Sequence, residues 1–90
     1  MTEPDDIRRK RLLFRSWHRG TKEADLLLGS FAEARLAGLS AAQLDEYERL
    51  LETEDARLWD WLTGRTAPPP ALDGDILRLI REFRYTARSS

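Results

Sequence analysis

The sequence predicts an all-α protein, a small compact bundle of five short antiparallel helices. Strand signals are nearly absent, because the chain has no valine, few isoleucines and no stretch that alternates apolar with polar residues. Leucine, alanine, glutamate and arginine, which favour helix, dominate the composition. Ninety residues suffice for one small domain, and we expect an ordered core over about residues 6–85 with short flexible termini.

The first two helices are predicted from apolar periodicity and from glycines that end them. The first should span about residues 6–19 and end at Gly20. Its buried face should hold the bulky side chains Ile7, Leu13, Phe14, Trp17 and His18. A basic stripe beside that face should be solvated and is made of Arg8, Arg11 and Arg15. The second helix should begin at residue 21 or 22, end at 37 and bury Leu27, Leu28 and Phe31.

The third helix carries the clearest local signal in the chain. Ser40 and Gln43 fit a capping box, and Leu39 and Leu44 fit a hydrophobic staple around it. The apolar face should continue through Tyr47 and Leu51.

Two further helices should follow the third. Asp55 is the expected cap of a fourth helix over residues 56–63, closed by Gly64, with one of Trp59 and Trp61 in the core and the other half-buried. The prolines at 68–70 predict an extended link. A last helix over about residues 73–85 should bury four apolar side chains, followed by a frayed tail. These four are Ile76, Leu79, Ile80 and Phe83.

Several chemistries are excluded by composition. The chain has no cysteine and one histidine, His18, so we expect no disulfide, no thiolate nucleophile and no metal site. No nucleophile–base pair is apparent, so an enzyme is not expected. No apolar stretch is long enough to span a membrane, and the acidic N-terminus fits neither a secretory nor a mitochondrial leader. We therefore expect a cytoplasmic protein without membrane insertion.

Charge is segregated along the chain although the net charge is only −1. Residues 1–22 are mainly basic and residues 23–64 mainly acidic. Such polarity can orient a docking partner, but it is too balanced for a typical nucleic-acid-binding domain. We therefore expect no nucleic acid as a partner.

One motif gives a functional prediction. Arg19-Gly20-Thr21-Lys22-Glu23, with Asp25 as a second acid, resembles the Arg-Gly-x-x-Glu signature of the SdhE family of succinate dehydrogenase assembly factors, also called flavinators. Residues 50–55 and 58–62 resemble the family's second signature, Leu-Leu-Glu, an acidic turn and a Leu-aromatic-x-Trp-Leu helix. The resemblance covers about residues 8–83. It departs from the pattern at His18, Thr21, Ala24 and Ala56.

The resemblance implies an assembly factor that binds a flavoprotein subunit and promotes covalent attachment of FAD. The implied client is the flavoprotein subunit of succinate dehydrogenase, with that of fumarate reductase as a second candidate. FAD would belong to the client, and the factor would hold no cofactor stably and be a monomer. The implied partner-binding residues are Arg19, Gly20 and Glu23, all expected to be solvent-accessible. The implied supporting contacts are Trp17, His18 and Asp25.

Plainer interpretations of the same residues remain open. Gly20 is also placed to cap a helix, and Glu23 lies in a first helical turn, where the helix dipole favours acids. Arg19 alone would be an ordinary solvated residue. The alternative function is an antitoxin-like or nucleic-acid-binding regulatory module that uses the basic first helix.

Overall fold

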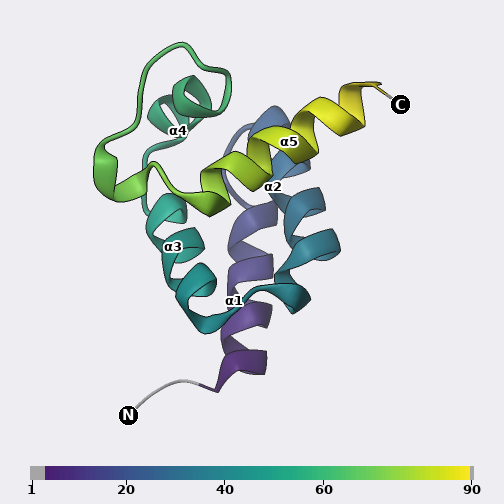
Figure 1. The fold of residues 1–90 in the computed structure, drawn as a ribbon. Coiled ribbons are helices and arrows are strands. Elements are labelled where there is room, and N and C mark those ends of the chain that lie inside the picture. The colour runs from purple at the N-terminus through teal and green to yellow at the C-terminus, as the bar shows by residue number, and fades with distance from the viewer. Residues whose placement is uncertain (1–3, 90) are drawn as a thin grey trace.

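A computed structural model describes residues 4–89 of the chain, with side chains through residue 84. Over this part of the chain the structure is all-helical, with no strand (Figure 1). Five α-helices follow in order: α1 (Asp5–Trp17), α2 (Lys22–Arg35), α3 (Ala41–Leu51), α4 (Asp55–Leu62) and α5 (Asp75–Ser89). Two single 3-10 turns connect them, η1 (Leu36–Gly38) and η2 (Pro70–Leu72). The predicted all-α class is confirmed.

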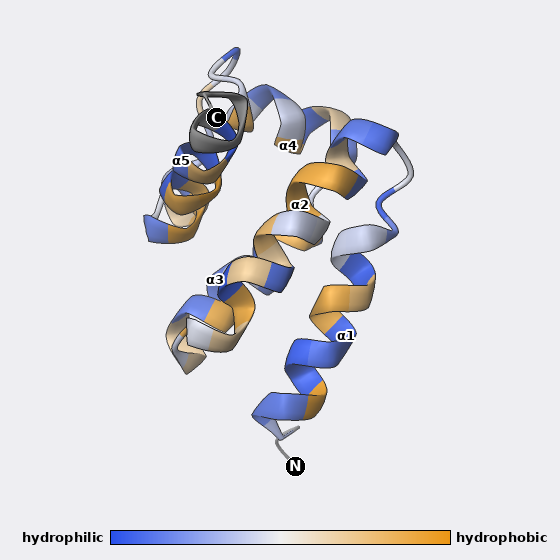
Figure 2. Cartoon of the chain, turned by 90° about the vertical axis from the view of Figure 1, so that its right-hand side faces the viewer, coloured by the Kyte–Doolittle hydropathy of each residue, from blue (hydrophilic) through white to orange (hydrophobic). Residues whose placement is uncertain are grey.

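Helix α2 packs against α1 and α5, while α3 packs against α1 and α5 as well. Helices α1 and α2 lie side by side and run in opposite directions, joined by the short turn at residues 18–21 (Figures 1 and 2). Helix α5 crosses the molecule obliquely and contacts both α2 and α3 (Figure 1). Figure 2 shows α1 and α5 on opposite sides of α2. The short α4 leads from α3 towards the proline-containing link.

One apolar core joins all five helices. Three aromatic rings meet in it at Phe31, whose ring centroid lies 5.7 Å from that of Tyr47 and 5.8 Å from that of Phe83. Tyr47 is completely buried, and its hydroxyl lies 2.5 Å from the hydroxyl of buried Ser16. Burial in this apolar surrounding raises the pKa of Tyr47 to about 12, because the phenolate would be poorly solvated there.

The buried face of α1 differs from the prediction. Ile7 and Phe14 are 51% and 64% exposed, whereas Leu12 and Ser16 are buried. Relative to the prediction, α1 is rotated about its axis, because α2 and α3 provide contacts for its other face. Arginines of α1 reach acids on α3, and Trp17 packs on Gly29 of α2, where a β-carbon would collide with the indole ring. Polar contacts therefore set the orientation of this helix as much as apolar burial does.

Several helix ends match the prediction and others correct it. Ser40 caps α3 with the full capping box, and Gly64 closes α4 with φ +79°. Glu54, not Asp55, occupies the N-cap of α4, and Asp55 is the first helical residue. Helix α5 continues through Ser89, so the predicted fraying after residue 85 is wrong over that range. The expectations for Met1–Glu3 and Ser90 lie outside the described residues.

Two more details of the core refine the prediction. Leu77 is fully buried, whereas Leu79 and Phe83 are only partly buried. Trp61 is the core tryptophan and Trp59 the half-buried one, which resolves the alternative that the sequence left open.

Arginine side chains satisfy the carbonyl groups at several helix ends. The last carbonyls of a helix have no intrahelical donor, and the guanidinium group supplies several donors in a rigid fork. Arg9 donates to the carbonyls of Leu36 and Leu39 at 3.1 and 2.9 Å, where α2 and η1 end. Arg81 of α5 donates to the carbonyl of Trp61 in the last turn of α4. These contacts tie one helix to the end of another.

Candidate functional site

The turn between α1 and α2 is built by two side chains of its own. The Asp25 carboxylate accepts the backbone N–H groups of Arg19 and Gly20, at 2.6 and 3.3 Å. Thr21 caps α2 by accepting the N–H of Ala24 at 3.3 Å. Asp25, predicted as a supporting contact to a partner, is thus placed to hold the turn within this chain.

Gly20 is exposed and adopts a backbone conformation that other residues rarely take. Its φ is +121°, in the region that disfavours a β-carbon. A β-carbon there would also lie 3.3 Å from an Asp55 carboxylate oxygen. The glycine therefore meets a local requirement of the turn and at the same time leaves the backbone bare on the surface.

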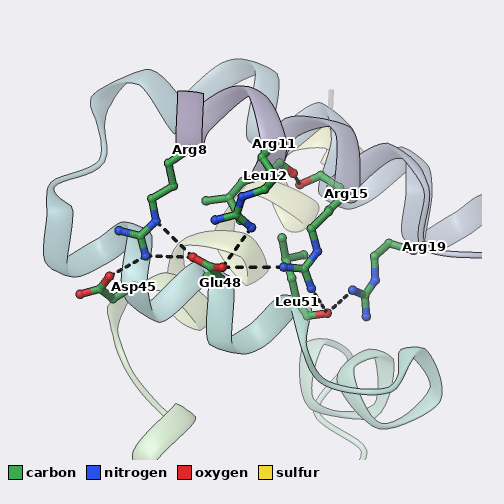
Figure 3. A network of polar contacts seen from close by, with 9 residues as sticks. Arg8, Arg11, Leu12, Arg15, Arg19, Asp45, Glu48 and Leu51 are labelled. Atoms are coloured by element: carbon green, nitrogen blue, oxygen red, sulfur yellow. Dashed lines mark hydrogen bonds and ion pairs between the residues drawn. The ribbon is translucent and has the colours of Figure 1, made fainter. Parts of the chain in front are cut away.

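Arg19 does not point into solvent, so its predicted accessibility is wrong. Its side chain is only 9% exposed. The guanidinium forms a 2.8 Å ion pair with Asp55 and donates to the carbonyl of Thr53 at 2.5 Å. It also donates to the carbonyl of Leu51, the last residue of α3 (Figure 3). Arg19 therefore binds the α1–α2 turn to the link between α3 and α4.

Glu23 is exposed, as predicted. Within the part of the chain whose side chains are described, its carboxylate has no hydrogen bond or ion pair. A hollow of about 470 Å³ lies beside it, with Thr21, Asp55, Ala56 and Trp59 forming the other walls. Glu23 is thus available to a cationic or hydrogen-bond-donating group on another molecule. We call Arg19, Gly20 and Glu23 together the motif corner.

Trp17 and His18 lie at the C-terminal end of α1, where the chain enters the turn. Trp17 packs on Gly29 and its indole Nε1 donates to Glu33 at 3.2 Å, so most of its contacts are internal. His18 is exposed, and its ring stacks on Phe14 with centroids 4.0 Å apart. Its Nδ1 lies 2.7 Å from the Phe14 carbonyl, which can only accept, so Nδ1 carries the hydrogen.

The predicted basic stripe faces α3 and is ion-paired there, while its side chains keep part of their solvent exposure. Glu48 receives Arg8 and Arg11 at 3.0 Å each, with Arg15 at 3.9 Å (Figure 3). Arg8 also pairs with Asp45. The hydrogen bond from Arg11, followed by that from Arg8, lowers the pKa of Glu48 against the opposing effect of burial. The alternative function required an open basic helix for phosphate contacts, and these pairings do not support it.

The groups at the motif corner are suited to binding another molecule. It offers a bare backbone segment at Gly20 and a carboxylate at Glu23, supported by Arg19 and Asp25. Among the described side chains, no buried polar atom lacks a hydrogen-bond partner, and no group of three or more possible metal ligands occurs. No described helix is long and apolar enough to cross a membrane.

Sequence reasoning missed the importance of Asp55. It was expected to cap its own helix, but its carboxylate instead holds Arg19, which lies 36 residues earlier. The one available signal was the position of both residues within the two matching signatures. Nothing in the local sequence distinguishes a first-turn aspartate from a capping one.

Comparison with known proteins places these features in a family. Residues 10–84 match the family described as flavinator of succinate dehydrogenase. The chain is similar to the FAD assembly factor SdhE of Acetobacter pasteurianus, with 44% identity over 83% of this chain and 69% of the relative. It is also similar to the mitochondrial succinate dehydrogenase assembly factors 2-B of Drosophila simulans and 2 of Debaryomyces hansenii. Identity to each is 39% over 89% of this chain, which spans 53% and 59% of those relatives.

Proposed function

This chain belongs to the family of flavinators of succinate dehydrogenase, and on that premise we propose that it binds a flavoprotein subunit and promotes covalent attachment of FAD. The likeness to proteins named FAD assembly factor and succinate dehydrogenase assembly factor supports this proposal. The client is the flavoprotein subunit of succinate dehydrogenase, with that of fumarate reductase as a second client. The chain acts as a monomer in the cytoplasm.

The single observation that supports docking at the motif corner is the unpaired, exposed carboxylate of Glu23 beside the bare backbone of Gly20. An exposed carboxylate in the first turn of a helix needs no partner to be stable. It is therefore free to accept a hydrogen bond or ion pair from a client. The positive φ of Gly20 leaves the turn without a side chain, so another backbone can approach closely.

Arg19 has a different part in this proposal. Its donors are occupied by Asp55, Leu51 and Thr53, so it supports the corner from inside. In this proposal Gly20 and Glu23 are the residues of the motif that contact the client directly. Asp25 fixes the same turn from α2, whereas Trp17, the last residue of α1, and His18 directly after it flank the turn.

The chain itself supplies binding and orientation, while the client's own FAD supplies the chemistry of bond formation. Docking would favour the client conformation in which a client histidine bonds covalently to the flavin. The protein holds no cofactor of its own in this scheme, and it turns over no substrate without the flavoprotein.

The test is complementation of cells that lack this protein. Covalent flavin on the denatured client is read by in-gel fluorescence, with expression levels matched. Glu23→Gln removes the charge while keeping the shape and should strongly reduce the fluorescent band. Its stability should change by no more than about 0.5 kcal/mol, because the side chain is exposed.

Asp6→Asn is the matched control. Asp6 is the second residue of α1, as Glu23 is the second residue of α2, and both side chains are exposed. Both changes therefore weaken the interaction with a helix dipole to the same degree. If Glu23→Gln restores the band as fully as wild type and Asp6→Asn do, the motif corner does not carry the function. Gly20→Arg is a poorer probe, since its positive φ would strain any side chain.

A further inference from the structure

The surface next to the motif corner contains a second hollow beside the first. It has a volume of about 440 Å³ and lies between α2, α4 and α5. Its walls include apolar parts of Leu26, Leu27, Trp59 and Phe83. Glu23 and Trp59 line both hollows, so the two lie next to each other on the surface. We call the two hollows together the Trp59 groove.

The groove exposes apolar surface that the fold does not use. Leu26 is 52% exposed in the second turn of α2, and Trp59 is only half-buried. Half-buried aromatic side chains in such hollows are typical anchors of protein–protein interfaces. The polar lining of the second hollow is limited to Glu23, Ser30 and Arg84, and apolar side chains supply the rest, so it offers mainly apolar contact. A protein segment fits this surface better than a cofactor does.

The charged residues of the groove determine the orientation of a segment that binds there. The unpaired Glu23 lines both hollows. Arg84 lies on the α5 side, with its guanidinium carbon 5.4 Å from the centroid of the Trp59 ring. A bound segment should therefore place a cationic side chain at Glu23, an apolar side chain against Leu26 and Trp59, and a neutral or acidic side chain near Arg84.

We propose that the Trp59 groove is the extension of the client-docking surface and that it binds a segment of the flavoprotein subunit in which a basic residue precedes or follows an apolar one. This inference rests on the proposed function, because the groove begins at the motif corner. Glu23 belongs to the motif corner and lines both hollows, so the two surfaces adjoin. The groove thus adds an apolar anchor to a corner that on its own offers only backbone and one carboxylate.

Single-cysteine labelling tests the location directly. The natural chain has no cysteine, so Leu26→Cys and Ile7→Cys each introduce one thiol. The two positions are matched, at 52% and 51% exposure, but Ile7 lies on the outer face of α1. The alkylation rate of each variant is measured by intact mass, with and without the purified succinate dehydrogenase flavoprotein subunit. Wild-type binding to that subunit is measured first by size-exclusion chromatography.

With the flavoprotein subunit at about ten times its Kd, roughly one-tenth of the chains stay free. The Leu26→Cys thiol should then react about tenfold more slowly, while the Ile7→Cys rate should not change. Leu26→Asp should also weaken binding by about tenfold or more, because an unpaired charge would be buried. Ile7→Asp should bind as wild type does.

The outcomes distinguish a failure of the groove inference from a failure of the proposed function. If wild type binds but the Leu26→Cys thiol stays reactive, or both thiols are protected equally, the groove inference is wrong and the proposed function stands. If the Leu26→Cys rate falls with the chain's own concentration and no client present, the occupant is a second copy, which also overturns the inference. If wild type does not bind the subunit, the proposed function fails and the groove assignment fails with it.

Discussion

Replacing Arg19 with alanine tests whether this residue of the motif supports the fold. The change removes the ion pair to Asp55 and two donors to the carbonyls of Leu51 and Thr53. A hydrogen bond to a charged group contributes about 1.5–3 kcal/mol, and loss of a partner leaves the remaining polar groups poorly solvated. Asp55 is 25% exposed and recovers part of its hydration, so the expected loss is about 3 kcal/mol.

For a domain of this size, a loss of about 3 kcal/mol lowers the melting temperature by about 12–24 °C. Thermal unfolding followed by circular dichroism measures this shift directly. Arg19→Lys keeps the positive charge beside Asp55 but cannot reproduce the guanidinium fork, so it should fall between wild type and Arg19→Ala. The double variant with Asp55→Ala should be less destabilised than the sum of the two single variants.

A small change in melting temperature would contradict the structural role of Arg19. If Arg19→Ala melts within about 3 °C of wild type, the contacts of Arg19 contribute little and the arginine is available to a partner after all. Glu23→Gln provides the comparison within the same motif, because its exposed side chain should leave the melting temperature almost unchanged.

Three further predictions concern other parts of the fold. As the pH rises from about 10 to beyond 12, wild type should lose roughly 2–3 kcal/mol relative to Tyr47→Phe, because the raised pKa of Tyr47 stabilises the fold below pH 10 and that stabilisation is lost as the pH passes 12; urea unfolding measures it. Stabilisation by Glu48, whose pKa is lowered, is present above its usual pKa and lost as the pH falls, so Glu48→Gln should reduce the slope of stability against pH below about pH 5. Ser40→Ala should cost about 0.5–2 kcal/mol in the same assay, and an unchanged midpoint would show that the capping box contributes nothing.

The parts of the fold that could be predicted are those determined by neighbours in sequence. The capping box needs only Ser40 and Gln43, and its geometry follows from a spacing of three residues. The closing glycine of α4 and the apolar repeat of α3 are local in the same sense. Each of these features depends on residues close in sequence and not on how the helices pack.

The orientation of α1 could not be predicted from its own sequence. The helix has two candidate faces, one with large apolar side chains such as Phe14 and one with arginines around Leu12. The choice depends on acids that α3 presents, about 35–40 residues later, and on the space at Gly29 of α2. Where long-range polar contacts compete with apolar burial, helical periodicity alone selects the wrong side.

Long-range contacts also explain why the motif corner was predicted only in part. The sequence groups Arg19, Gly20 and Glu23 because they are close in the chain, and it suggests one role for all three. The structure separates them, since Arg19 turns inward to the α3–α4 link while Gly20 and Glu23 stay on the surface. The inward arginine fixes the position of the turn relative to α4, which supplies Trp59 beside Glu23. Loss of Arg19 should therefore impair docking indirectly, and a binding defect in Arg19→Ala that is relieved by low temperature or a stabilising additive would demonstrate this route. A defect that persists in the fully folded variant would instead show that Arg19 contacts the client itself.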